Sequence, residues 1–163
     1  MKTENEISEI IAELLAEKKQ LFEKFESITE QMMTDSFDEI DMIVECVDRR
    51  EELRKQIDEL DLKISSTAME CENGEEIIKA SKNLCDFSEV SPALQKVFTA
   101  GQEVFGVISR IQSADPQAVR NMKAMMEELQ QKIRQNKKNS KFTGYINTMG
   151  LQASKGALYD KKR

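Results

Sequence analysis

Apolar side chains recur every three or four residues near the start of the chain. Between residues 7 and 32 the steps alternate between four and three, and only Lys18 interrupts them. A seven-residue repeat with two apolar positions is typical of helices that pack side by side. Further apolar residues flank this stripe and widen it, which favours a bundle over a two-stranded coiled coil. The stripe comprises Ile7, Ile11, Leu14, Leu21, Phe25, Ile28 and Met32.

Polar residues just before the apolar stripes predict where the first two helices begin. Thr3 and Glu6 have the spacing of a capping box, in which each side chain bonds the backbone amide of the other residue. Ser36 and Glu39 have the same spacing and predict a second helix start directly after the first helix ends. Because the connection is so short, the two helices are expected to be antiparallel neighbours in a long hairpin.

Proline and glycine mark the later helix boundaries. Ser91-Pro92 and Asp115-Pro116 each place a capping side chain before a proline, an arrangement favoured at the first turn of a helix. The second of these is either a kink in one long helix or a true turn. Asn73-Gly74 predicts a turn, followed by a short helix over Glu75–Leu84. The long helices are expected over about 4–34, 37–66, 92–113 and 116–138.

These elements predict an all-α fold, an elongated antiparallel helical hairpin or helical bundle with coiled-coil-like packing over residues 1–138. Residues 139–163 lack a sustained apolar period and hold three of the six glycines, so a flexible basic tail is expected. No apolar run approaches the ~18 residues that span a bilayer. The acidic N-terminus is not typical of a signal peptide. The three scattered cysteines, with no CxxC pair, indicate a cytoplasmic protein with free thiols.

The residue types needed for most catalytic and metal sites are missing. The chain holds no histidine, which removes the Ser-His, Cys-His and His-metal arrangements. Glycine-rich phosphate-binding loops and calcium-loop spacings do not occur in it either. The adjacent acidic pairs point about 100° apart on a helix and do not share a proton. The sequence therefore predicts a protein that is not an enzyme and that needs no cofactor or metal.

Charge is distributed unevenly along the chain. Residues 132–163 hold nine Lys or Arg and one acid, a net charge of +8. Residues 1–131 hold 15 Lys or Arg and 29 Asp or Glu, a net charge of −14. A solvated tail, a protein partner with an acidic face and nucleic-acid binding are all compatible with this asymmetry. Nucleic acid is the least favoured partner, because the acidic body would repel phosphate.

Methionine is the chemically unusual residue of the chain, with nine in 163 positions. Those of the last predicted helix lie on one apolar face, where they either fill gaps in the core or line an adaptable groove for a partner's amphipathic helix. Met125 lies beside the strict stripe and is expected to be the most exposed of them. Apolar residues of the tail are candidates for the same partner. The candidate partner-binding residues are Met122, Met125, Met126, Leu129, Ile133, Tyr145, Ile146, Leu158 and Tyr159.

Arg50 occupies a position of the second stripe where an apolar residue is due. Two interpretations follow from this position. The guanidinium could pair with an acid across the hairpin and set the register of the helices. Alternatively, the side chain could lay its apolar stem along the surface and keep its charge in water.

The stretch from Ile28 through Leu60 combines the end of a long acidic helix, a turn with an acidic–Ser step and a second helix dense in charge. Its core consists of FDEID at 37–41 and RREEL at 49–53. This combination resembles the small bacterial flagellar export chaperones of the FlgN/FliT type. The size, the acidic character and the end of the chain, with Tyr145 and then LYDKK at 158–162, are similar as well. The interruption at 65–90 has no match in that pattern.

The resemblance implies a non-enzymatic cytosolic chaperone. Such a chaperone binds helical segments of late flagellar substrates, the hook-associated or filament-cap proteins, and delivers them to the export gate. In the family the C-terminal helical region contacts the substrate, which corresponds here to the last helix and the tail. Two alternatives stay open: a coiled-coil module that self-associates as a homodimer, and a nucleic-acid-binding regulator that uses residues 132–163.

Overall fold

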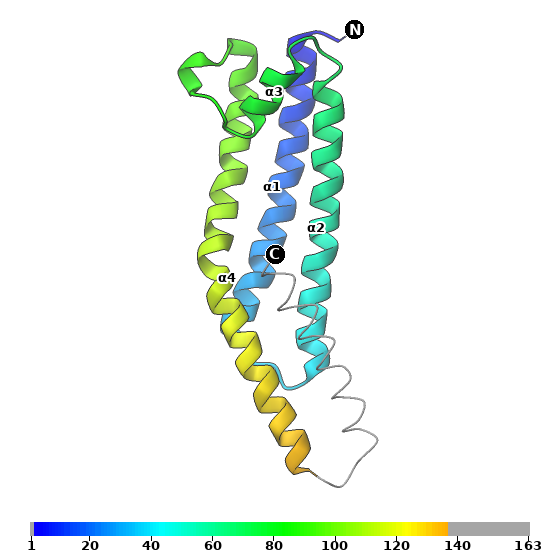
Figure 1. Cartoon of the computed structure of the whole chain (residues 1–163), viewed down its shortest axis with the longest axis vertical. Coiled ribbons are helices and arrows are strands. Elements are labelled where there is room, and N and C mark those ends of the chain that lie inside the picture. Colours follow the sequence, from blue (N-terminus) through cyan, green and yellow to red (C-terminus); the bar gives the residue numbers. More distant parts are fainter. Residues whose placement is uncertain (1, 137–163) are drawn as a thin grey trace. The chain divides into compact units, whose positions relative to one another are not determined.

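The computed structural model describes residues 2–136, and these residues form helices joined by turns, with no strand among them. The fold is all-α and its helices pack as in a bundle, as the sequence predicts. The elements in chain order are α1 (Glu4–Thr34), α2 (Ile40–Ala68), α3 (Gly74–Ser81), the 3₁₀ turns η1 (Phe87–Glu89) and η2 (Pro92–Leu94), and α4 (Gln95–Gln135) (Figure 1).

The described residues divide into two compact units. Among the described residues, the first unit comprises residues 2–26 and 53–111, and the second comprises residues 27–52 and 112–136. Each of the three long helices contributes residues to both units. Each unit is described below by itself.

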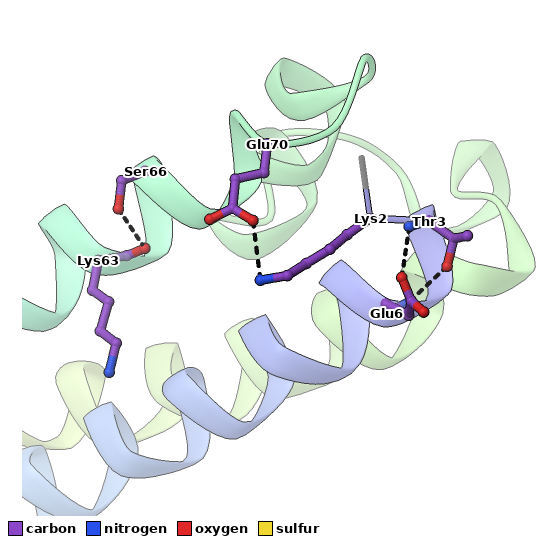
Figure 2. A network of polar contacts seen from close by, with 6 residues as sticks. All are labelled: Lys2, Thr3, Glu6, Lys63, Ser66 and Glu70. Atoms are coloured by element: carbon purple, nitrogen blue, oxygen red, sulfur yellow. Dashed lines mark hydrogen bonds and ion pairs between the residues drawn. The ribbon is translucent and has the colours of Figure 1, made fainter.

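The first helix begins at the predicted capping box. The backbone amide of Thr3 donates to Glu6 Oε2 at 2.9 Å, and the backbone amide of Glu6 donates to Thr3 Oγ1 at 3.2 Å (Figure 2). The two side chains thus satisfy amide groups that have no partner within the helix. Beside the box, Lys2 forms an ion pair with Glu70, 3.1 Å away, which joins the start of α1 to the end of α2.

The core of the first unit is built from the apolar faces of α1, α2, α3 and α4. Ion pairs along its edges show how the long helices run. Lys2 pairs with Glu70 and Lys18 with Asp61, so α1 and α2 are antiparallel there. The buried apolar residues include Ile7, Ile11, Leu14, Leu15, Ile64, Ile77, Leu94, Val97 and Val104. The predicted seven-residue stripe therefore faces the inside of the molecule in this unit.

The short helix α3 ends at a left-handed residue. Asn83 has a positive φ of 54°, a conformation that asparagine tolerates better than most residues. The Asn83 amide donates to the Ala80 carbonyl and the Leu84 amide to the Lys79 carbonyl, the pair of bonds that closes a Schellman C-cap. The Asn83 side chain also donates to the Phe98 carbonyl at 3.0 Å, which ties the cap to α4.

The start of α2 differs from the prediction by three residues. The helix begins at Ile40 and not at Phe37. The backbone amide of Phe37 points instead at Met125, with 3.4 Å between the amide nitrogen and Sδ, and the Phe37 side chain is half-buried. The connection between α1 and α2 therefore contacts α4, and α2 begins after that contact.

The expected separate helices over 92–113 and 116–138 are one helix, α4, of 41 residues with Pro116 inside it. A proline cannot donate to the carbonyl four residues earlier, and its ring crowds that carbonyl. The helix nevertheless continues because Ala118 and Met122, in the turns that follow, are buried against the rest of the second unit. Tertiary packing thus outweighs the local stop signal.

Candidate partner-binding site

The buried centre of the second unit is rich in methionine. Met32 of α1 and Met122 and Met126 of α4 have only 3%, 3% and 5% of their surface exposed. Ala118 of α4 and Ile43 of α2 are buried in the same unit. We call Met32, Met122 and Met126 the methionine seam. Because methionine is unbranched and flexible, such a seam packs against differently shaped surfaces more readily than a core of branched residues.

A charged pair is buried in the same unit. Arg50 of α2 is 5% exposed, and one of its terminal nitrogens lies 2.8 Å from Asp115 Oδ1 of α4. Its other terminal nitrogen donates to the Met32 sulfur at 3.1 Å. Burial lowers the pKa of the Arg50 guanidinium, whereas the charge and hydrogen bond of Asp115 raise it. Arg50 is therefore buried and paired, but its acid lies on α4 and not across the hairpin of α1 and α2, where the sequence placed it.

Two further polar contacts hold α4 within the second unit. The Asn121 side chain donates to the Met32 carbonyl at 2.6 Å. The amide of Phe37 donates to the Met125 sulfur, as described above. The contacts between α4 and the other two helices are thus polar at several points, unlike the mostly aliphatic core of the first unit.

The structure separates the three predicted methionines. Met122 and Met126 pack inside the second unit, which is the core-filling role that the sequence left open for them. Met125 is half-buried and is the most exposed of the three, as expected. Binding of a partner by any of them stays a prediction.

Leu129 and Ile133 continue from Met125 at steps of four residues, so the three side chains share one face of the last turns of α4. All three are half-buried, while charged or polar residues occupy much of the rest of these turns. We call Met125, Leu129 and Ile133 the terminal stripe. An apolar stripe of this spacing matches the way in which one amphipathic helix packs on another. The other predicted residues, Tyr145, Ile146, Leu158 and Tyr159, lie outside the described residues.

Several exposed apolar side chains lie where the sequence analysis singled out no site. Leu84 and Phe87, in the connection between α3 and α4, are 68% and 49% exposed. The Phe87 ring packs edge-on against Phe98, with 5.5 Å between ring centroids. Residues in this connection follow no helical period, so a search for apolar stripes could not find them. Leu62 of α2 is 73% exposed.

Among residues 2–136 no cluster of three or more Cys, Asp or Glu side chains could hold a metal ion. The three cysteines carry free thiols, and Cys46 is the buried one. Within the same residues no helix has the length and the apolar content that a bilayer crossing requires.

Comparison with known proteins adds no assignment: no family model, curated protein or solved structure matches the chain.

Proposed function

We propose that the chain is a non-enzymatic chaperone of flagellar export that binds an amphipathic helix of its client on the terminal stripe of α4. The observation that carries the proposal is the half-buried run of Met125, Leu129 and Ile133 on one face of an otherwise polar helix end. Apolar contacts at positions i, i+4 and i+8 are those by which a helix recognises another helix. Methionine at the first position supports tolerance of more than one client.

The resemblance of residues 28–60 to FlgN/FliT-type chaperones supports the choice of client class. On that basis the clients are helical segments of hook-associated or filament-cap proteins, and the chaperone acts in the cytoplasm before export. The absence of histidine from the whole chain supports a binding role over a catalytic one.

Self-association through the seven-residue stripe is less well supported. Ile7, Ile11 and Leu14 are buried within the first unit, and Ile28 and Met32 within the second. A stripe whose side chains pack inside the chain is not available as a seam between two copies. The apolar surface left for a partner lies elsewhere, and the terminal stripe is part of it.

Isothermal titration with synthetic peptides of the C-terminal helices of hook-associated and filament-cap proteins tests the proposal. The full chain should bind one of them with saturable 1:1 stoichiometry. The double variant Leu129→Glu/Ile133→Glu should bind about a hundredfold more weakly, because two apolar contacts are replaced by charges. Leu62→Glu, which makes the same kind of substitution once, at an exposed leucine of α2, should bind as the wild type does.

The proposal is wrong if no peptide binds, or if the double variant retains the wild-type affinity. A light-scattering mass that rises with concentration, in the absence of peptide binding, would point to the self-associating module. Binding to nucleic acid that weakens steeply with added salt would point to the regulator.

A further inference from the structure

The first position of the terminal stripe lies against the connection between α1 and α2. The backbone amide of Phe37 donates to Met125 Sδ at 3.4 Å. Asp35, Asp38 and Glu39 lie within two residues of Phe37 in the chain, and two residues span at most about 7 Å. The Met125 end of the stripe therefore has several carboxylates close to it.

These carboxylates belong to a longer acidic stretch of the second unit. Residues 35–48 hold six Asp or Glu and no Lys or Arg, and we call them the acidic segment. All six acidic residues are exposed. Exposed charges act over a Debye length of about 8 Å at physiological ionic strength, so the segment attracts cations of a partner that docks beside it. The six residues are Asp35, Asp38, Glu39, Asp41, Glu45 and Asp48.

The other end of the terminal stripe is basic. Lys132 and Arg134, in the last turn of α4, stand on either side of Ile133 and are exposed. Residues 129–136 hold no acid. Lys132 pairs with Glu128 at 3.5 Å, but both side chains are exposed, and such a pair is weak in water. The apolar stripe thus runs from a negative end at Met125 to a positive end at Ile133.

We infer that the partner of the terminal stripe is an amphipathic helix with Asp or Glu in its first turn and Lys or Arg in its last turn, and that it lies antiparallel to α4. The inference rests on the proposed function for the site. It goes beyond that function in stating the charges of the partner helix and the direction in which it binds.

The direction follows from the two charged ends. A helix with acids in its first turn and bases in its last turn is stabilised by its own dipole, and α4 carries its bases in the same place. When such a partner lies antiparallel to α4, its basic last turn faces the acidic segment and its acidic first turn faces Lys132 and Arg134. The parallel arrangement would bring like charges together at both ends, which selects against it.

Two synthetic peptides of about 18 residues test the charge pattern. Both have leucine at positions i, i+4 and i+8, and a hydrocarbon staple on the opposite face keeps both helical. The first peptide has Glu in its first turn and Lys in its last turn, and the second has these charges exchanged. In isothermal titration at low salt the full wild-type chain should bind the first peptide at least about tenfold more tightly than the second. The preference should shrink to about twofold in ~0.5 M NaCl, where charges are screened.

Charge reversal in the acidic segment locates the source of the preference. Asp38→Lys/Glu39→Lys should bind the second peptide at least as tightly as the first. Because lysine just before a helix disfavours its dipole, the milder Asp38→Asn/Glu39→Gln provides a second variant, in which the preference should fall to about threefold or less. The control Asp58→Lys/Glu59→Lys makes the same reversal at exposed residues of α2 in the first unit and should retain the full preference.

Photo-cross-linking of the first peptide tests the direction. Benzoylphenylalanine in the last turn of the peptide should cross-link to residues 35–48, and in its first turn to residues 129–136, as mapped by mass spectrometry. The opposite assignment of the two cross-links would overturn the antiparallel arrangement.

The outcomes separate this inference from the proposed function. Equal affinity of the wild type for the two peptides, with loss of binding in Leu129→Glu/Ile133→Glu, would overturn the charge selection and retain the terminal stripe. A preference that survives in Asp38→Lys/Glu39→Lys, or that is lost equally in the control, would overturn the role of the acidic segment. If neither peptide binds the wild type, the proposed function fails and this inference fails with it.

Discussion

Arg50 and Cys46 lie one turn apart on α2, and burial shifts the acid–base equilibria of both in the direction that disfavours charge. The pKa of the Arg50 guanidinium is lowered by burial, and Asp115 counteracts this shift. The pKa of the Cys46 thiol is raised above its ordinary value of 9.0, chiefly by burial; the charge of Arg49 opposes this shift, and the charge of Glu45 adds to it. The second unit thus carries one compensated charge and one thiol that is held neutral.

The stability of the protein should depend on Cys46 at alkaline pH. Since the folded-state pKa of this thiol is raised, its contribution to stability is fully present below the ordinary value of 9.0 and is lost as the pH rises above it through the folded-state pKa. Above about pH 9 the free energy of unfolding in urea should therefore fall more steeply in the wild type than in Cys46→Ala. If the free energies of unfolding of the two proteins changed with pH in parallel, this assignment would be contradicted. A constant difference between them, caused by the smaller alanine side chain, would not affect that test.

At the scale of the element, the bounds of the long helices show how far local sequence determines structure. The capping box at Thr3 and Glu6 was predictable because both of its bonds lie within four residues. The sequence left undecided whether α4 continues through Pro116, since the continuation depends on the burial of Ala118 and Met122 by segments distant in sequence. The late start of α2 has the same origin, in the contact between Phe37 and Met125.

Alanine substitutions at two glycines of α4 should change the stability of the protein in opposite directions. A Cβ at Gly101 would lie 2.2 Å from the Ser81 carbonyl oxygen, whereas a Cβ at Gly106 would meet nothing within 4 Å. Gly101→Ala should therefore lower the free energy of unfolding by about 1–3 kcal/mol, because α3 would have to move. Gly106→Ala should raise it by about 0.5–1 kcal/mol, the difference in helix propensity.

Urea unfolding monitored by circular dichroism measures both glycine variants against the wild type. Changes of the same sign in the two variants would contradict the close approach of α3 to α4 at Gly101. That approach is also where the Asn83 side chain bonds the Phe98 carbonyl, so Asn83→Ala offers an independent check of the same contact.

At the scale of the whole molecule, the periodicity of the sequence predicted the all-α class and both bounds of α1, because these depend on patterns repeated over many residues. The candidate site was less predictable. Met122, Met125 and Met126 stand close together in the sequence, yet two are buried and one is half-buried, which depends on where α1 and α2 pack. Likewise, the partner of Arg50 is 65 residues away, and no local pattern points to it.

The two units also differ in what holds them together. The first has a cluster of aliphatic side chains from four helices. The second combines methionines with a charged pair and a side-chain bond to a backbone carbonyl. We expect the second unit to open locally at a lower free energy than the first.

The central claim is that a client helix binds on the terminal stripe of α4, and site-specific photo-cross-linking tests it most directly. Benzoylphenylalanine would replace Leu129 in one full-length protein and Leu62 in another, and each would be irradiated with the C-terminal helical segment of a hook-associated or filament-cap protein. The account predicts cross-links from position 129 that excess unlabelled client abolishes, and none from position 62. Absence of cross-links from position 129 at saturating client, or equal yields from both positions, would contradict it.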